Sequence, residues 1–395
     1  MTNRRDTLKT LGGLAVLSAL PGLGLAQGAS SERRLVFVFL RGGLDGLAAV
    51  PAYGDPDLAR RRGDLATAAP GEVNGALALD GTFALHPFLP EMHKLYRSGE
   101  AAVLHAVATP YRDRSHFDAQ NVLENGTAKP YGRDAGWLNV ALAQAAQRSG
   151  GVALGASVPL VLRGPAPVTS WSPSVMPSPD PDLLDRLGRL YRDDPLLAKP
   201  FAAALETEAL MEGQGTRDGG RSGRGAPVAV LAQAAGRLLS QPDGPRVATI
   251  DFGGWDTHAN QAGELGPLAR NLRQLDRATA TLKASLGPAW RHAVVLVVTE
   301  FGRTVAINGS RGTDHGTAAA AFALGGAVRG GRVIAQWPGL GDRDLHEGRD
   351  LRPTLDLRAL LKAALAAQLG TSEAALETQV FPDSRGVPPL EGLFA

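Results

Sequence analysis

The hydrophobic residues of this chain fall into short, continuous runs more often than into alternating ones. Six runs predict β-strands: Leu35–Leu40, Ala102–Ala108, Val158–Leu162, Val247–Phe252, Ala293–Thr299 and Ala321–Leu324. Several of them contain no polar residue, which is typical of strands that are covered on both faces. The pattern therefore predicts a mostly parallel sheet with helices on each side.

Segments with the helical spacing of apolar residues lie between these runs. They predict seven helices: Pro87–Arg97, His116–Asn125, Ala135–Gln147, Pro181–Tyr191, Val228–Leu239, Leu265–Ser285 and Leu357–Leu369. In the sixth, Leu268, Leu272 and Leu275 recur near the helical period. Asp356 is expected to be the N-cap of the last helix. The alternation of strands and helices predicts a doubly wound α/β fold with a mostly parallel sheet flanked by helices.

Residues 1–29 are expected to be an export signal outside the fold. The stretch from Asn3 to Lys9 resembles a twin-arginine signal, and an apolar stretch follows from Leu11 to Leu25. That stretch is short and broken by Gly and Pro, so we expect no stable membrane span in the mature chain, although an uncleaved anchor is the alternative. The signal predicts a periplasmic or secreted protein carried by the twin-arginine translocation machinery.

The remaining residues, 30–395, are expected to form one domain. We find no internal repeat and no clear linker between domains. Residues 206–227 are rich in Gly and Arg, which predicts a flexible insertion. The two alternatives for this insertion are a lid near the site and a surface loop.

Composition excludes several classes of function. The chain has 395 residues and no cysteine, which excludes disulfides, thiolate catalysis and cysteine-ligated zinc. It has 41 basic and 39 acidic residues, and removal of residues 1–29 leaves 38 of each. A mature chain without net charge gives no indication of a nucleic-acid partner.

The segment after the run Val247–Phe252 contains an acid and a histidine, Asp256 and His258. An extended backbone directs the side chains of residues two apart to the same side. Ligands of open α/β sheets bind beyond the carboxyl ends of the strands. The pair is therefore a candidate for metal binding, and the alternative is a turn that the Asp256 side chain stabilises.

Ser115 directly precedes the predicted helix His116–Asn125. One interpretation is an N-cap, with Asp118 completing a pair that resembles a capping box. The other is a nucleophile whose developing charge is stabilised by the helix N-terminus and by a metal. Arg112 and Arg114 are candidates for holding an anionic substrate.

Further acids lie near the ends of other strands. Asp45 follows the first strand in a glycine-rich turn, and Glu300 follows the fifth strand. Asp314 and His315 are adjacent in a glycine-framed loop before the last strand. The alternatives are turns stabilised by the aspartates and an ion pair between Glu300 and Arg303.

In a parallel sheet, these strand ends meet at one edge, where their side chains are expected to converge. Four carboxylates in one cleft would repel one another without a cation. Oxygen and nitrogen ligands suit Zn²⁺, Mn²⁺, Mg²⁺ or Ca²⁺. We therefore predict a divalent metal site with these ligands: Asp45, Asp256, His258, Glu300, Asp314 and His315. His105 and His116 stay outside it, because a lone histidine beside an apolar strand is usually a packed residue.

Five motifs together carry a family resemblance: Phe39–Gly46, Arg114–Asp118, Gly253–His258, Thr299–Thr304 and Gly312–Gly316. As a set they resemble an exported bacterial family of unknown function, domain-of-unknown-function family 1501. The resemblance covers nearly all of the mature chain. That family is similar in fold to the alkaline phosphatase and sulfatase superfamily, whose members hydrolyse phosphate or sulfate esters with metals. The resemblance implies an alkaline-phosphatase-like fold.

The resemblance also implies roles for residues at matching positions: a metal acid at Asp45, a nucleophile at Ser115 and metal ligands at Asp256 and His258. The segment from Thr299 to Gly302 stands where the superfamily has Thr-x-Asp-His-Gly. Phe301 cannot bind a metal, so the resemblance leaves a second metal site incomplete unless Asp314 and His315 supply the missing ligands.

These observations favour an exported metal-dependent hydrolase of phosphate or sulfate esters, acting on a small anionic ester or a polymer. Arg41, Arg112 and Arg303 would stabilise charge in the transition state. The alternative is a non-catalytic metal-binding or assembly protein that retains the fold, which Phe301 favours. A third, weaker hypothesis is a carbohydrate- or polymer-modifying enzyme, although aromatic residues make up only 5% of the chain.

Overall fold

A computed structural model describes residues 32–395 except for 146–149, 174–179, 195, 199–200, 203, 206–226 and 264. The predicted export signal, residues 1–29, lies outside the described residues. Almost all of the predicted insertion, 206–227, lies outside them too.

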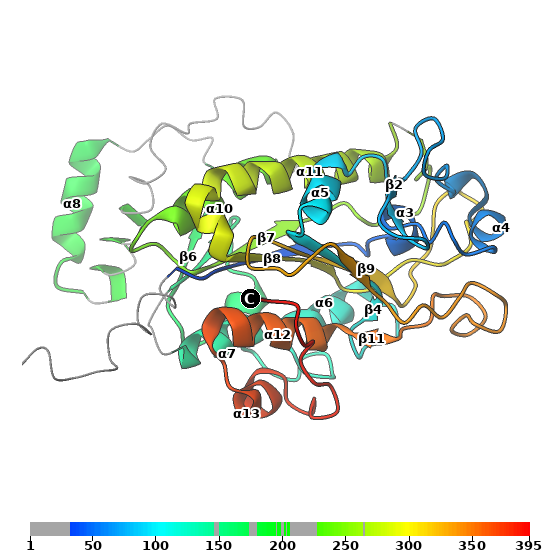
Figure 1. Cartoon of the computed structure of the whole chain (residues 1–395). Helices are drawn as coiled ribbons and strands as arrows, with labels where there is room; N and C mark the ends of the chain where they lie inside the picture. The colour runs from blue at the N-terminus through cyan, green and yellow to red at the C-terminus, as the bar shows by residue number, and fades with distance from the viewer. Residues whose placement is uncertain are drawn as a thin grey trace, which may run out of the picture.

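A large sheet runs through the middle of the molecule (Figure 1). Its strands follow the order β10-β4-β9-β8-β1-β7-β5-β6, and β11 pairs with β4. Their bounds are β1 (Arg34–Leu40), β4 (Ala101–Ala108), β5 (Gly151–Leu154), β6 (Val168–Trp171), β7 (Val247–Phe252), β8 (Ala293–Thr299), β9 (Ala319–Leu324), β10 (Arg332–Ile334) and β11 (Leu355–Asp356). All pairs are parallel except those of β9, which is antiparallel to β4 and β8. A separate hairpin consists of β2 (Leu77–Ala78) and β3 (Ala84–Leu85).

Five of the six predicted strands are confirmed, as β1, β4, β7, β8 and β9. The prediction for Val158–Leu162 was wrong, because Leu160–Leu162 forms a single 3₁₀ turn, η2. Pro159 precedes that turn and has no N–H to donate to a neighbouring strand. The strands of this region are the short β5 and β6 on either side of it, which the sequence analysis missed.

All seven predicted helices are confirmed, with small shifts at their ends. They are α5 (Pro90–Arg97), α6 (His116–Asn125), α7 (Trp137–Gln144), α8 (Pro181–Tyr191), α10 (Val228–Ser240), α11 (Pro267–Leu286) and α12 (Leu357–Leu369). Asp356 caps α12 as predicted, since its side chain accepts a hydrogen bond from the Arg358 N–H. Shorter helical turns are α3 (Gly46–Ala49), α4 (Leu58–Arg62), η1 (Gly63–Leu65), η3 (Gly287–His292), α13 (Glu373–Ala375) and η4 (Leu376–Val380).

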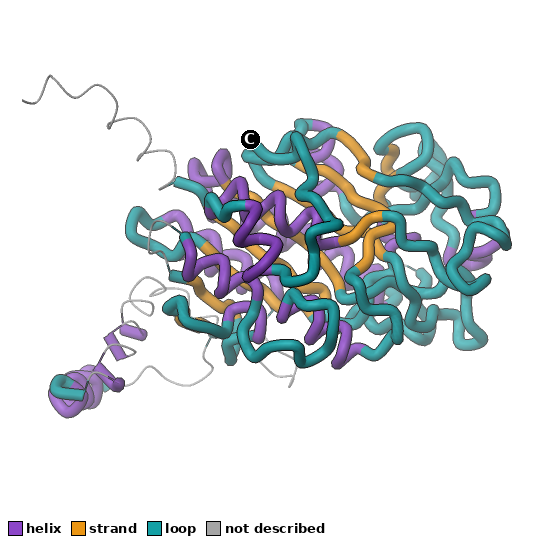
Figure 2. The backbone as a smooth tube through the Cα atoms, turned by 90° about the horizontal axis from the view of Figure 1, so that it is seen from below, coloured by secondary structure: helices purple, strands orange, loops and turns teal. Residues whose placement is uncertain are grey.

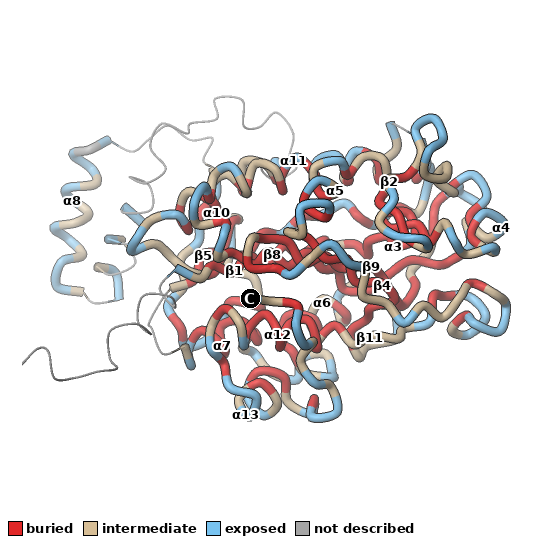
Figure 3. Tube along the Cα trace, in the orientation of Figure 1, coloured by how far each residue is buried: buried red, intermediate tan, exposed pale blue. Residues whose placement is uncertain are grey.

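Helices cover both faces of the sheet, with α5, α10 and α11 on one face and α6, α7 and α12 on the other (Figure 1). Alternate residues of β1 enter the two cores: Val36 and Val38 pack on the first side, Leu35 and Phe37 on the second. The strands are buried throughout the middle of the sheet (Figure 3). The fold is therefore the predicted doubly wound α/β architecture with a mostly parallel sheet.

The helix α8 lies apart from the two layers when the molecule is seen from the side and from below (Figure 1; Figure 2). Within the described part of the chain, no helix has both the length and the apolar character needed to cross a membrane.

Two features bring distant segments to one edge of the sheet. Because β9 is antiparallel to β8, the loop before β9 reaches the edge where β1, β7 and β8 end. The turns after β1 and β7 touch at Gly42, which has a φ of +119°. A Cβ atom at Gly42 would lie 2.5 Å from the Asp256 backbone nitrogen, so only glycine permits this close approach.

Candidate metal centre

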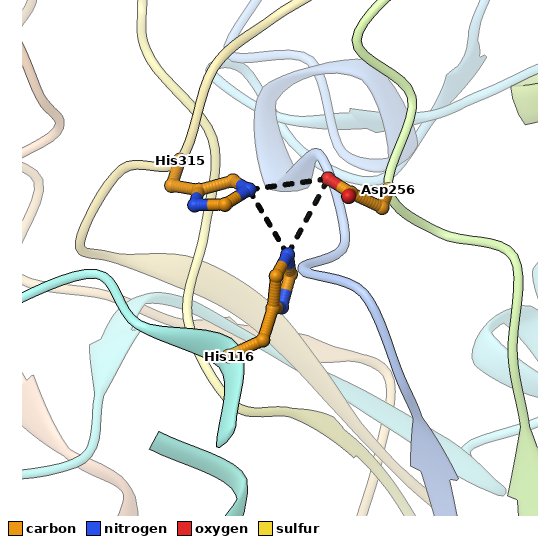
Figure 4. A group of neighbouring side chains, drawn as sticks. All are labelled: His116, Asp256 and His315. Carbon is orange, nitrogen blue, oxygen red and sulfur yellow. Dashed lines mark hydrogen bonds and ion pairs between the residues drawn. The ribbon is translucent and has the colours of Figure 1, made fainter. Parts of the chain in front are cut away.

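Side chains from three segments converge at this edge. His116 is the first residue of α6, Asp256 and His258 lie in the turn after β7, and His315 lies in the loop before β9. Figure 4 shows His116, Asp256 and His315 pointing toward one another. The group contains atoms of two residue types that metals prefer, imidazole nitrogens and a carboxylate oxygen.

The distances within the group are short. The Nε2 atom of His315 lies 3.0 Å from the Nε2 atoms of both His116 and His258. Asp256 Oδ1 lies 3.0, 3.3 and 3.4 Å from the Nε2 atoms of His258, His315 and His116. Ligand atoms about 2.0–2.1 Å from a tetrahedral Zn²⁺ would be about 3.3–3.4 Å apart. The spacings of 3.0–3.4 Å are at or slightly below that value, and the compact group consists of His116, Asp256 and His315, with His258 at its side.

The other ring nitrogen of each histidine faces a hydrogen-bond acceptor. His116 Nδ1 lies 2.8 Å from Glu300 Oε1, and His258 Nδ1 lies 3.2 Å from Asp314 Oδ1. His315 Nδ1 lies 3.0 Å from the backbone oxygen of Arg114. In His116 and His315 these acceptors place the hydrogen of a neutral ring on Nδ1 and a lone pair on Nε2, whereas His258 has a carboxylate oxygen beside each ring nitrogen.

His116 Nε2, His315 Nε2 and Asp256 Oδ1 thus lie together, with His258 Nε2 beside the last two. Lone pairs and a carboxylate oxygen so close together repel one another without a cation or extra protons, and a divalent cation among them would remove that repulsion. The carboxylates of Asp256, Glu300 and Asp314 and the Arg303 guanidinium together carry a net charge of −2 when the rings are neutral, and the nearby Arg349 guanidinium reduces it to −1. The donor set fits a divalent metal by its chemistry and by its spacing.

Glu300, predicted as a metal ligand, lies behind His116. It is buried, and its Oε1 atom accepts hydrogen bonds from His116, from the Gly42 N–H at 2.8 Å and from Gln120 Nε2 at 3.0 Å. Its Oε2 atom accepts from the Thr299 hydroxyl at 3.0 Å. Burial raises the pKa of Glu300, but the bonds from His116 and Gln120 outweigh it and hold the pKa below its ordinary value. The carboxylate is therefore suited to orienting the ring.

Arg303 supports Asp256 in the same way. Its side chain is completely buried, and it donates to Asp256 Oδ1, to both oxygens of Thr313 and to the Gly42 carbonyl. Burial raises the pKa of Asp256, but the hydrogen bond and charge of Arg303 outweigh it and lower the pKa. The alternative ion pair of Arg303 with Glu300 is not formed, because Arg303 pairs with Asp256 and Glu300 with His116.

Asp45, also predicted as a ligand, belongs to a different network. Its carboxylate forms a buried ion pair with Arg62 and accepts from Gln261 and from the Ala48 N–H, which it caps at the start of α3. None of these partners is one of the three histidines.

Ser115 and Arg112 contact their own loop. Ser115 is the N-cap residue of α6, but its side chain makes no capping hydrogen bond, contrary to the capping interpretation. It interacts instead with the Tyr111 hydroxyl. Arg112 donates to the backbone oxygens of Thr109 and Tyr111.

His116 and Gln120 are the site residues that the sequence analysis missed. They are four residues apart and therefore share one face of α6, at the helix end nearest the other candidates. The His116 ring packs on Phe301 with a centroid distance of 4.7 Å, and Phe301 also lies 5.2 Å from the His315 ring. Phe301 thus forms an apolar wall where a superfamily histidine was expected.

The neighbouring rings of His116 and His315 have opposite pKa shifts. Burial lowers the pKa of His116, but its hydrogen bond to Glu300 and the surrounding carboxylates outweigh this and raise the pKa above 6.5. Burial and the charge of His116 lower the pKa of His315. When the pH falls, His116 is therefore protonated before His315, and the Glu300 carboxylate stabilises the protonated His116 ring.

A family model described as "Protein of unknown function (DUF1501)" matches residues 32–380. The chain belongs to this family. The resemblance that the five motifs indicated is thereby confirmed.

Several solved structures are similar to the chain at low sequence identity. One is the C-terminal periplasmic domain of EcEptC from Escherichia coli in complex with Zn, with 10% identity, a TM-score of 0.39 and coverage of 78% of this chain and 77% of that one. The lipoteichoic acid synthase LtaP from Listeria monocytogenes has 12% identity, a TM-score of 0.41 and coverage of 90% and 76%. The PsFucS1 sulfatase from Pseudoalteromonas sp. has 13% identity, a TM-score of 0.41 and coverage of 100% and 77%. A search of curated proteins finds no match.

Proposed function

We propose that this protein is an exported metal-dependent hydrolase of phosphate or sulfate esters. The observation that carries the proposal is the compact group formed by His116 Nε2, His315 Nε2 and Asp256 Oδ1, with His258 Nε2 3.0 Å from both His315 Nε2 and Asp256 Oδ1. The class of substrate rests on the motifs that resemble the phosphatase and sulfatase superfamily.

The exposure of the group supports a catalytic role over a structural one. The side chains of Asp256 and His258 are 42% and 43% exposed, and those of His116 and His315 are 20% and 26% exposed. Structural metal sites are closed by protein ligands, whereas catalytic sites keep a position for water or substrate. A half-exposed group leaves room for an ester oxygen, as the fourth ligand of a cation held by three of the residues or as a fifth ligand if all four bind.

Each residue has a separate task in this proposal. His116, Asp256, His258 and His315 hold the cation, which when bound polarises the ester and lowers the pKa of a nearby nucleophile. Hydrogen bonds from the Nδ1 atoms fix the orientation of the three rings. The nucleophile is either a water molecule or the hydroxyl of Ser115, which is not used for capping.

One observation favours the second candidate, a non-catalytic metal-binding or assembly protein. The arginines expected to hold the anion or to stabilise charge in the transition state already have partners. Arg303 pairs with Asp256, Arg112 with backbone oxygens, Arg41 with Glu124 and Asp251, and Arg114 with Glu347 and Asp350. An ester would then be bound by the cation and by backbone N–H groups, or it would not be bound at all.

The two candidates are separated by assaying the metal-loaded, exported protein against a panel of phosphate and sulfate monoesters. The hydrolase proposal predicts turnover that Asp256→Ala abolishes, whereas the matched control Asp342→Ala, at an exposed ion pair, retains it. Loss of turnover in Ser115→Ala with retained metal would assign the nucleophile to Ser115, and retained turnover would assign it to water. A metal-loaded protein that turns over no ester would support the non-catalytic candidate.

A further inference from the structure

A cavity of about 400 Å³ lies at the carboxyl ends of β5, β6 and β7. Its lining includes Gly155, Ser157, Ser172, Thr249 and Asp251. Pockets that hold small ligands have volumes of roughly 300–1,000 Å³, so this cavity is large enough for one. It lies on the same edge of the sheet as the candidate metal centre, because β7 leads into both.

Asp251 gives this cavity a partly free acceptor. Its side chain is 41% exposed, and its two oxygens lie 3.2 and 3.0 Å from Nη2 of Arg41. A carboxylate has about four lone-pair sites, so pairing with one guanidinium nitrogen leaves acceptor capacity toward the cavity.

Thr249 gives the cavity a polar group without a partner. Thr249 is one of the residues that line the cavity and is 2% exposed as a whole residue, and its covered hydroxyl oxygen has no hydrogen-bond partner among the described residues. A buried hydroxyl without a partner is unfavourable and uncommon, so it calls for an explanation. Because the oxygen is covered, pairing it with a ligand requires a rotation of the Thr249 side chain.

Hydrogen bonds connect this cavity to the candidate metal centre. Arg41 Nη1 donates to Gln120 Oε1 at 3.0 Å, and Gln120 Nε2 donates to Glu300 Oε1 at 3.0 Å. Glu300 in turn holds His116. Asp251 and Asp256 are five residues apart in the chain, which limits the distance between their Cα atoms to about 18 Å. One extended substrate molecule can therefore reach both places.

We propose that the cavity binds the uncharged, polyhydroxylated part of a substrate whose ester anion lies at the metal centre. The location of the ester rests on the proposed function, whereas the chemistry of the cavity does not. Asp251 repels an anion and accepts hydrogen bonds from hydroxyl groups. The serine and threonine side chains of the lining both donate and accept, which suits a ligand with several hydroxyls.

The test measures binding of the neutral probe methyl α-D-glucopyranoside to the exported, metal-loaded protein by saturation-transfer NMR and calorimetry. Loss or weakening of one hydrogen bond to the ligand lowers affinity by up to about tenfold. We expect such an effect for Thr249→Val, which removes the hydroxyl, and for Asp251→Asn, which replaces a charged acceptor with a weaker neutral one. Thr371→Val is the matched control for a buried, unpartnered hydroxyl, and Asp342→Asn is the control for a paired aspartate. Both controls should bind the probe as the wild type does, and all variants should retain their metal.

The inference would be overturned if the wild-type protein did not bind the probe. It would also be overturned if the two single variants, Thr249→Val and Asp251→Asn, both bound the probe with wild-type affinity. The Asp256→Ala/His258→Ala variant separates this inference from the proposed function. Probe binding that persists in this variant supports the cavity even if no ester is ever hydrolysed. Probe binding that disappears with the metal would place the probe at the metal centre and contradict the cavity assignment.

Discussion

Asp45 and Asp256 lie beyond strands that end at the same edge of the sheet, but their carboxylates have opposite surroundings. Asp45 is buried and its oxygens face donors: Arg62, Gln261 and the N–H of Ala48. Asp256 is 42% exposed, and Oδ1 accepts from Arg303, while its other neighbours are the Nε2 atoms of the three histidines.

The difference separates a carboxylate that stabilises the fold from one that is prepared for a cation. Both follow parallel strands in glycine-rich turns, so position along the chain does not distinguish them. Only the hydrogen-bond partners, which come from distant segments, decide the role. Three experiments use this contrast.

The largest effect is expected at Asp45. Asp45→Ala leaves the Arg62 charge buried without its partner and removes the cap of α3, so we expect a loss of about 3–5 kcal/mol in the free energy of unfolding. Urea denaturation of the metal-free protein measures this. Asp256→Ala, at a half-exposed residue, should destabilise the metal-free protein much less. Equal losses in the two variants would remove the contrast.

A smaller effect is expected at Glu300. Glu300→Gln keeps the shape of the side chain but weakens its hold on His116 Nδ1, and loss of such an outer partner lowers metal affinity by about 10–100-fold. Competition with a chelator measures the affinity. The matched control is Glu91→Gln, which disrupts an exposed ion pair with Lys94. An affinity in Glu300→Gln that equals the wild-type value would show that Glu300 does not support the centre.

The smallest effect concerns pH. A metal ion must displace a proton from His116 in order to bind. Burial lowers the pKa of His116, but the hydrogen bond to Glu300 outweighs burial and raises the pKa above its ordinary value of 6.5. Metal affinity should therefore already fall as the pH drops through this raised value, by at most about tenfold per pH unit for one proton.

The free energy of unfolding of the metal-free protein should change with pH in the opposite direction to the metal affinity. The stabilisation from protonated His116 is fully present below pH 6.5 and is lost as the pH rises through the raised pKa. Chelator competition and denaturation, each at several pH values, measure the two trends. In Glu300→Gln both transitions should move to lower pH, and transitions that stay in place would contradict the role of Glu300.

Much of the fold could be predicted because the long strands are continuous apolar runs. The apolar runs of β7 and β8 therefore predicted the bounds of both strands correctly. The four-residue strands β5 and β6 are too short to produce a clear pattern, and Pro159 lies in an apolar run that resembles a strand. The antiparallel direction of β9 depends on pairing with distant strands, which no local pattern records.

The candidate site could be predicted in part. Asp256, His258 and His315 lie in glycine-framed turns beside strand ends, and the structure brings them together. His116 was left out because a histidine at a helix start has no distinctive local signal. Asp45 and Glu300 have the same strand-end position as Asp256, but Arg62 and His116, which engage their carboxylates, come from distant segments.

The most direct test of the central claim is the metal content of the natively produced protein, measured by mass spectrometry beside Asp256→Ala/His258→Ala. We predict close to one divalent ion per chain in the wild type and its loss in the double variant, while the variant remains folded. A wild-type protein that carries no metal, or a folded double variant that retains it, would contradict the assignment of His116, Asp256, His258 and His315 as the metal centre.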